Sequence, residues 1–299
     1  MSYLPGKFVW FEHLSNDIPK ARKFYDALFG WHTESMPIGD RRYSMILNGD
    51  GTTSTGIGGY GAAAPGARPS WMSYLSVADV DAAYRDALAA GASSVMAPMD
   101  FGPVGRGATL TDPTGAVFSV WKSAEGDAPD TPKTAIGGWC WNELWTRDDQ
   151  KALAFYERVF GYGHDAMEMG PQGTYYMLKT GEAMRAGLMR AVDPKAPSMW
   201  LPYVAVADCD NTVARAKALG GQVLSAPQDI PNIGRFAILQ DPLGAAIALI
   251  RMTGCPRVTG RAVTAGAGLG ARRVNTFVHR HQTIRPWLVA RSPRTMARQ

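Results

Sequence analysis

The strongest constraint in this sequence is an internal repeat. The segment Trp10-Phe11-Glu12, followed by Phe24-Tyr25 and Phe29-Gly30, returns 131 residues later as Trp141-Asn142-Glu143, Phe155-Tyr156 and Phe160-Gly161. A second block, from Trp71 to Ala116, returns 129 residues later, from Trp200 to Ala245. Because both blocks keep their order and nearly the same spacing, the chain is a tandem duplication.

The length agrees with two domains. The chain has 299 residues, about twice a usual domain, and each copy of roughly 120 residues can bury its own core. Residues 123–135 are polar and contain proline, which predicts an exposed linker. We therefore predict domains at 1–122 and 136–251, and a separate tail at 252–299.

The net charge of +5 is concentrated in that tail. Residues 252–299 contain nine arginines, no lysine and no carboxylate, so the tail carries +9 and the rest of the chain −4. Its composition predicts a disordered, basic, low-complexity segment. One interpretation is an arm that contacts polyanions, the only route to nucleic acid that we expect. The other is that the native protein ends near Arg251.

The cysteines and the N-terminus predict a cytoplasmic protein without a membrane partner. Cys140, Cys209 and Cys255 are widely separated, which favours neither a disulfide framework nor a zinc knuckle. The first residues lack a basic segment followed by an apolar one, and no stretch has the apolar length needed to span a bilayer.

The hydrophobic pattern predicts the same elements in each copy. An apolar strand at 8–14 or 139–145 leads into a helix that Asp17 or Asp148 would cap, and a glycine follows the last helical turn. Short strands come next, and the pattern restarts at Trp71, with Asp79 as the next cap. Each domain is thus predicted to contain two βαβββ units, an α+β fold.

The helix segment 17–31 (DIPKARKFYDALFGW) and the turn 111–116 (TDPTGA) resemble the vicinal oxygen chelate superfamily, which includes glyoxalase I, bleomycin-resistance proteins and extradiol dioxygenases. The resemblance covers about residues 7–251. It implies that two βαβββ units curl a mixed sheet into a cup around a small-molecule site. It also implies that the two domains form an intramolecular pseudo-dimer, and it is compatible with a homodimer of such chains.

The resemblance further implies a divalent metal held by His, Gln or Glu side chains on the first, inner and last strands. In this sequence those positions fall on Trp10, Trp141, Met72, Leu201, Ser119 and Ala248, with the inner-strand positions at about Gly58 and Met189. Zinc and transition metals need three or four N, O or S donors, so we expect no metal and no other cofactor. The alternative is a shifted metal site that uses Glu12, Glu143 or His13.

Strand alternation assigns a set of aromatic and polar residues to the cup face. The predicted ligand-binding residues are Trp10, Glu12, Met72, Tyr74, Ser119, Trp121, Trp141, Glu143, Leu201 and Tyr203. Trp71 and Trp200 have the opposite parity and are expected in the core, and the aspartates of the two Asp-Pro-x-Gly turns, Asp112 and Asp241, are expected to be structural.

Glu12 and Glu143 are the candidate catalytic residues. A carboxyl group beside tryptophan in a concave site can bind a cation, orient a polar substrate or act as a base with a raised pKa. The alternative is structural: each glutamate would hydrogen-bond a backbone turn or an arginine such as Arg106 or Arg235.

These features favour a metal-independent protein of the glyoxalase/bleomycin-resistance type that binds or sequesters a small aromatic or heterocyclic molecule. The alternative is an enzyme, either a lactoylglutathione lyase-like lyase or isomerase or an extradiol dioxygenase-like oxidoreductase. It would use Glu12 or Glu143 as a base or as an unorthodox metal ligand. A third hypothesis is a protein with no ligand at all.

Overall fold

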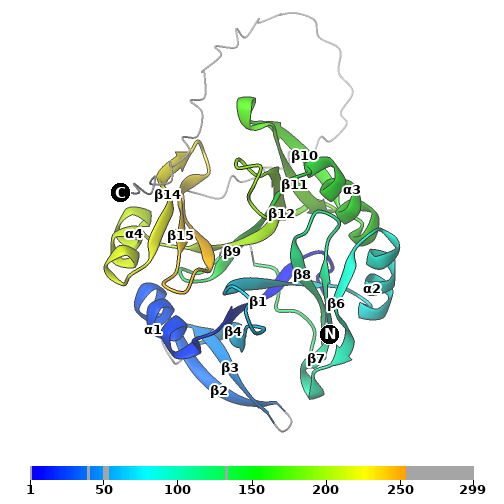
Figure 1. Cartoon of the computed structure of the whole chain (residues 1–299), viewed down its shortest axis with the longest axis horizontal. Helices are drawn as coiled ribbons and strands as arrows, with labels where there is room; N and C mark the ends of the chain where they lie inside the picture. Colours follow the sequence, from blue (N-terminus) through cyan, green and yellow to red (C-terminus); the bar gives the residue numbers. More distant parts are fainter. Residues whose placement is uncertain (1, 39–40, 50–53, 132–133, 254–299) are drawn as a thin grey trace, which may run out of the picture.

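Each half of the chain folds into one curved sheet with two helices. The computed structural model describes residues 2–38, 41–49, 54–131 and 134–253 (Figure 1). The first half contains β1 (Phe8–Ser15), α1 (Ile18–Phe29), β2 (His32–Ile38), β3 (Arg41–Asn48), β4 (Thr55–Ala62), β5 (Ser70–Ser76), α2 (Val80–Ala89), β6 (Ser93–Asp100), η1 (Gly102–Val104), β7 (Gly105–Thr111) and β8 (Val117–Ser123).

The second half repeats this order. It contains β9 (Trp139–Thr146), α3 (Asp149–Phe160), β10 (Gly163–Glu168), η2 (Gly170–Gln172), β11 (Thr174–Thr180), β12 (Ala183–Arg190), β13 (Met199–Ala205), α4 (Cys209–Ala218), β14 (Gln222–Ile230), β15 (Gly234–Gln240) and β16 (Ala246–Met252). The predicted pair of βαβββ units in each domain is confirmed.

The two sheets have the same strand order, β2-β3-β4-β1-β5-β8-β7-β6 and β10-β11-β12-β9-β13-β16-β15-β14. In the first sheet β1 is central, parallel to β4 and antiparallel to β5, so Glu12 lies between Gly59 and Met72. The corresponding strand β9 places Glu143 between Gly187 and Leu201. The glutamates therefore occupy equivalent central positions in the two sheets.

The helices begin at the predicted caps. Asp17 and Asp148 each accept a hydrogen bond from the backbone N–H three residues later, which satisfies a donor that the first helical turn leaves unpaired. Gly30 and Gly161 end these helices with φ values of 74° and 67°, a left-handed conformation that glycine adopts without a Cβ clash.

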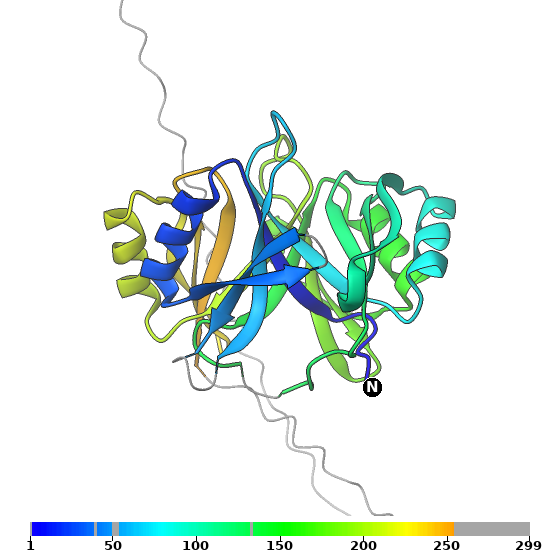
Figure 2. The ribbon, with the colours of Figure 1, turned by 90° about the horizontal axis from the view of Figure 1, so that it is seen from below.

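A shared core joins the two domains into an intramolecular pseudo-dimer. Helix α1 lies beside α4 on one flank and α2 beside α3 on the other, with the sheets between them (Figures 1 and 2). Aromatic pairs cross the junction: the rings of Phe8 and Trp200 are 4.5 Å apart, and those of Trp71 and Trp139 are 4.9 Å apart. Trp71 and Trp200 are buried in this core, as predicted.

Each Asp-Pro-x-Gly turn binds a tyrosine of the other domain. Oδ2 of Asp241 accepts from the hydroxyl of Tyr25 at 3.0 Å, and Oδ2 of Asp112 accepts from the hydroxyl of Tyr156 at 3.0 Å. The other oxygen of each aspartate accepts backbone N–H groups of its own turn. The predicted structural role is confirmed, and it includes a link between the domains.

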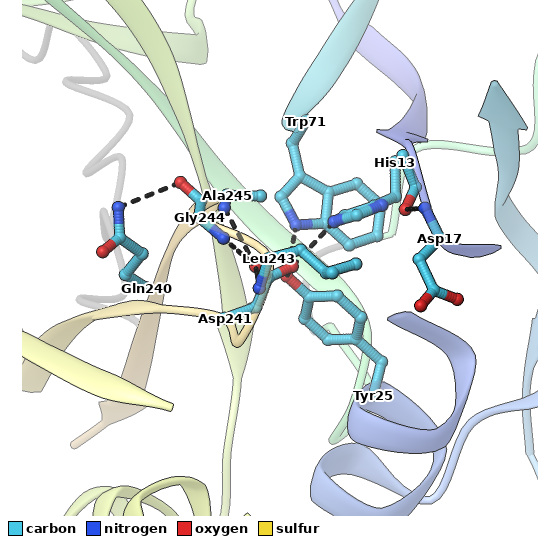
Figure 3. Close-up of polar contacts among 10 residues, drawn as sticks. His13, Asp17, Tyr25, Trp71, Gln240, Asp241, Leu243, Gly244 and Ala245 are labelled. Carbon is cyan, nitrogen blue, oxygen red and sulfur yellow. Dashed lines mark hydrogen bonds and ion pairs between the residues drawn. The ribbon is translucent and has the colours of Figure 1, made fainter. Parts of the chain in front are cut away.

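One of these links has an additional member. Nε2 of His13 lies 2.7 Å from Oδ2 of Asp241, and both side chains are fully buried (Figure 3). Trp71 completes the group, because its Nε1 donates to the hydroxyl of Tyr25. His13 therefore lies on the core side of β1, as strand alternation predicts, and is a packing residue. Leu144 takes its place in the second domain.

The predicted tail lies almost entirely outside the described residues, together with Cys255, so its disorder stays a prediction. Within the part of the chain that is described, no helix combines the length and apolar character needed to cross a membrane.

Candidate functional site: a carboxyl group in each aromatic cup

Glu12 is the centre of a hydrogen-bonded group on the cup face of the first domain. Its Oε2 accepts a hydrogen bond from the hydroxyl of Tyr74 at 2.6 Å. A second phenol, that of Tyr43, also hydrogen-bonds its carboxyl group. Nε1 of Trp10 in turn donates to the Tyr43 hydroxyl at 3.0 Å. The structure thus brings Trp10, Glu12 and Tyr74 together, as predicted from strand alternation.

Tyr43 was not among the predicted site residues, and glycine explains how it reaches Glu12. A Cβ atom at Gly59 would lie 2.0 Å from the Tyr43 hydroxyl oxygen, so only glycine at this point of β4 leaves room for the phenol. The second domain has the same pair, because a Cβ at Gly187 would lie 2.0 Å from the Tyr175 hydroxyl oxygen. The repeated tyrosine in the third strand of each copy was the available signal.

The remaining predicted residues of the first cup line β5 and β8. Ser119 is buried and its Oγ lies 2.8 Å from Oγ1 of Thr109. The rings of Trp121 and Tyr74 meet edge to face, with centroids 6.2 Å apart. Met72 is paired with Glu12 across the β1–β5 ladder. Ser119 excepted, the predicted residues of this cup are half-buried, which leaves part of each accessible.

Glu143 occupies the equivalent place in the second cup but is enclosed. Its carboxyl oxygens accept from the hydroxyls of Tyr175 at 2.8 Å and Tyr203 at 3.1 Å, and from Nε1 of Trp145. Nε1 of Trp141 donates to the Tyr175 hydroxyl at 2.9 Å. The side chain of Glu143 is 6% exposed. Three donors therefore hold this carboxyl group inside the protein.

Both glutamates have raised pKa values. Burial disfavours the charged form of Glu12 and raises its pKa, and the hydrogen bonds from Tyr74 and Tyr43 only partly oppose that effect. Burial also raises the pKa of Glu143 against its three donors. The pKa of Tyr74 is raised by burial and by the nearby Glu12 carboxylate, so its phenol stays protonated and remains a donor. The pKa of Glu12 is thus higher than that of an exposed glutamate, a shift in the direction that suits a general acid or base.

The structural alternative for the glutamates is wrong in its choice of partner. Arg106 binds Asp81 at 2.8 Å and also Asp100, and Arg235 binds Asp210 and Asp229. Asp81 and Asp210 lie in the first turns of α2 and α4, and Asp100 and Asp229 lie on the strands paired with the two arginines. Phenol and indole groups bind the glutamates instead.

The predicted inner-strand positions need a correction. Gly58 pairs with Phe11 on β1, whereas Met189 pairs with Trp145 on β9, so the two positions are not equivalent. Side chains of successive strand residues point to opposite faces, and the equivalent inner-strand residues that face the cups are Gly59 and Gly187. The count along the chain failed because loops of different length precede β4 and β12.

The side chains at the family's ligand positions do not fit a divalent metal. Across the first cup these positions carry an indole, a thioether and a hydroxyl, from Trp10, Met72 and Ser119, and the inner strand contributes glycine. In the described residues, no three His, Cys, Asp or Glu side chains lie close enough together to hold a metal ion. The hydrogen-bond partners of Glu12 are the phenols of Tyr74 and Tyr43, which leaves it without the further ligands that zinc or iron requires.

Two surface hollows lie away from the cups. One, of about 380 Å³, lies between the start of α3 and the β10–β11 hairpin, beside the ion pair of Arg190 with Asp149. The other, of about 280 Å³, lies beside Arg106 and Lys122, where β7 begins and β8 ends. Neither contains Glu12 or Glu143.

Comparison with known proteins agrees with this architecture. The model of the Glyoxalase/Bleomycin resistance protein/Dioxygenase superfamily matches residues 7–120 and 140–249, most of both halves. The chain belongs to this superfamily. A Mycobacterium tuberculosis protein named "Putative glyoxylase CFP32" is 40% identical over 253 residues, which cover 83% of this chain and 96% of that protein. The Streptomyces peucetius "Anthracycline biosynthesis protein DnrV" is 31% identical over 277 residues, covering 87% and 98%.

Solved structures of this superfamily share the fold at low sequence identity. The Mn(II)-bound glyoxalase from Novosphingobium aromaticivorans superposes with a TM-score of 0.59 at 16% identity, covering 83% of this chain and 82% of that one. The 2,2',3-trihydroxybiphenyl 1,2-dioxygenase from Sphingomonas wittichii strain RW1 has a TM-score of 0.56 at 16% identity, covering 84% and 91%. The arrangement of paired cups is thus common to superfamily members whose names describe different reactions.

Proposed function

We propose that this chain binds a small aromatic or heterocyclic molecule in an aromatic cup without a metal ion, and that it serves as a binding or sequestration protein. The observation that carries the proposal is the half-buried carboxyl group of Glu12, set among the indole of Trp10 and the phenols of Tyr43 and Tyr74. Such a wall offers flat apolar surface together with a small number of directed hydrogen-bonding groups, the usual composition of a small-molecule site.

The relatives support an aromatic ligand. The name of DnrV places it in anthracycline biosynthesis, and anthracyclines contain a flat, fused aromatic ring system with hydroxyl and carbonyl groups. The superfamily description also includes bleomycin resistance proteins, a precedent for binding without turnover. Neither name assigns a ligand to this chain, so the proposal rests on the chemistry of the cup.

The test is a binding titration of the full chain with 1,4-dihydroxyanthraquinone, followed by quenching of tryptophan fluorescence. A hydrogen bond to a charged group contributes about 1.5–3 kcal/mol, so Glu12→Gln should weaken binding about 10-fold or more. Glu34→Gln is the matched control, because Glu34 is exposed on β2. Equal affinities for the wild-type chain and Glu12→Gln would contradict the proposed role of this carboxyl group.

Metal independence has its own measurement. The purified chain is dialysed against zinc, nickel, manganese or iron salts and then analysed for metal content. We expect no retained metal and no change in dye affinity. One tightly held metal ion per domain would contradict the conclusion that the side chains at the family's ligand positions do not fit a metal. Glu12 and Glu143 would then be the candidate ligands.

A second candidate function is acid–base catalysis of the isomerase or lyase type. The raised pKa of Glu12 favours it, because a carboxyl group that titrates closer to neutrality can both accept and donate a proton. The name of CFP32 refers to a glyoxylase. Metal-free turnover of a hemithioacetal that is lost in Glu12→Gln, with the dye still bound by the wild-type chain, would favour this candidate over sequestration.

A further inference from the structure

The two cups share a group of residues around the central glutamate but have different cup-facing residues on β7 and β8 and on the corresponding strands β15 and β16. Both contain the tryptophan, tyrosine and glutamate group described above. Four cup-facing positions on β7 and β8 correspond by strand pairing to four positions on β15 and β16. The residue differs between the two domains at each of these positions. They are Gly107, Thr109, Ser119 and Trp121 in the first domain, and Phe236, Ile238, Ala248 and Ile250 in the second.

In the second domain these side chains fill the cup. Phe236, Ile238, Ala248 and Ile250 form one apolar cluster with Leu201 and Tyr203, and every member is at most 6% exposed. The rings of Tyr203 and Phe236 lie 6.5 Å apart within it. Together with the enclosed carboxyl group of Glu143, this cluster is a packed core, and packed protein interiors leave no room for a ring system.

In the first domain the cup face is more exposed, because Trp10, Glu12, Tyr74 and Trp121 are half-buried rather than buried. Gly107 has no side chain where the second domain has Phe236, and the indole of Trp121 lies against the glycine backbone. A Cβ at Gly107 would lie 2.9 Å from Cε3 of Trp121, and a Cβ at Gly105 would lie 2.6 Å from its Cζ2. The two glycines therefore let the indole lie flat along β7, and its half-buried state leaves part of the ring accessible.

A line of hydroxyl groups runs beside this indole. Thr109 Oγ1 and Ser119 Oγ are 2.8 Å apart, Ser119 hydrogen-bonds the Tyr74 hydroxyl, and Tyr74 donates to Glu12 at 2.6 Å. In the second domain the first two positions are Ile238 and Ala248, so this line is absent there. A molecule in the first cup thus meets an indole face and a row of neutral donors and acceptors that ends in a carboxyl group.

We propose that each chain has one ligand site, in the cup of the first domain, and that its ligand is a neutral, planar aromatic molecule with hydroxyl or carbonyl groups along one edge. The ring stacks on Trp121, and the polar edge hydrogen-bonds Tyr74 and Glu12. Gly107 is the specificity-determining residue, because only glycine there lets the Trp121 indole lie against β7 as the stacking surface. This inference rests on the proposed function and deepens it.

The test transfers the packing of the second cup to the first. The double variant Gly107→Phe/Trp121→Ile reproduces the pair Phe236 and Ile250, which this fold already accommodates. Titration calorimetry of the full chain with 1,4-dihydroxyanthraquinone should give one equivalent bound by the wild-type chain and at least a 10-fold loss of affinity in the double variant. Far-UV circular dichroism and the melting temperature establish that the variant is folded.

A second variant changes the hydroxyl line without filling the cup. Ser119→Ala installs the residue of the second domain and should weaken binding of the dihydroxy compound several-fold while leaving that of unsubstituted anthraquinone unchanged.

The outcomes separate the inference from the proposed function. Two bound equivalents per chain, or undiminished affinity in a folded double variant, would overturn the single site and leave the proposed function intact. Tighter binding of a cationic aryl amine than of the dihydroxyanthraquinone would overturn the ligand class. Absence of binding to the wild-type chain would overturn both.

Discussion

Replacing Asp241 by asparagine should destabilise the folded chain more than the same change at Asp112. The two aspartates occupy equivalent turns, and each accepts a hydrogen bond from a tyrosine of the other domain at 3.0 Å. Only Asp241 also contacts His13, whose Nε2 lies 2.7 Å from Oδ2 with both side chains fully buried. Asp112 has one contact that Asp241 lacks, a hydrogen bond from the Thr114 hydroxyl to its Oδ1 at 2.8 Å. The difference between the two variants therefore compares the histidine contact with this single hydroxyl hydrogen bond.

The expected magnitudes follow from the contacts. Loss of a hydrogen bond to a charged group costs about 1.5–3 kcal/mol, and we expect that range for Asp112→Asn. Removal of one partner that leaves a second buried polar group unsatisfied costs about a further 1–3 kcal/mol. We expect this additional loss for Asp241→Asn, since His13 has no other hydrogen-bond partner for its ring within the described residues.

Urea unfolding of the full chain, followed by far-UV circular dichroism, measures the free energy of unfolding of each variant. The double variant His13→Leu/Asp241→Asn is the control for the histidine, because the second domain already carries leucine at this position as Leu144. It should lose no more stability than Asp241→Asn alone. If Asp241→Asn and Asp112→Asn destabilise the chain equally, the buried contact with His13 contributes no more than the Thr114 hydrogen bond of Asp112, and the reasoning is refuted.

Three further predictions concern glycine packing and pH. Gly59→Ala should destabilise the chain by about 1–3 kcal/mol, because its Cβ would lie 2.0 Å from the Tyr43 hydroxyl oxygen. Gly163→Ala is the control: this position has open space around it, so the variant should be neutral in the same urea experiment. Burial alone would raise the pKa of Asp241, but its hydrogen bond and attraction to His13 lower it below the ordinary value. Its stabilising effect is therefore complete above the unfolded pKa and is lost as pH falls through the lower folded value, so wild type and Asp241→Asn should converge in stability below about pH 4. Affinity for the dihydroxy dye should rise with pH through the raised pKa of Glu12, where the carboxylate becomes an acceptor for the ligand hydroxyl; a titration curve that Glu12→Gln leaves unchanged would contradict this.

The sequence alone determined the architecture of this protein. The duplication, the aspartate caps and the glycine stops are local features, and each depends on backbone hydrogen bonds within a few residues of the cap or the turn. Strand alternation placed Glu12 and Trp10 on the cup face and Trp71 in the core for the same reason, since side-chain direction follows directly from the two-residue period of a strand. The family positions on β1, β5 and β8 and on their repeats could also be found by counting along the chain, and they carry no metal-donor side chains of the family type.

Only the tertiary structure decided which groups meet. Tyr43 on β3 reaches Glu12 on β1 across the intervening strand β4, and His13 reaches Asp241 in the other domain. The register of β4 could not be counted through loops of unequal length. These contacts join residues far apart in the chain, and their geometry depends on sheet register and domain packing. The difference between the two cups also depends on tertiary structure. Gly107 and Phe236 occupy equivalent positions, and the effect of this difference appears only when strand pairing brings Trp121 beside the glycine and Ile250 beside the phenylalanine.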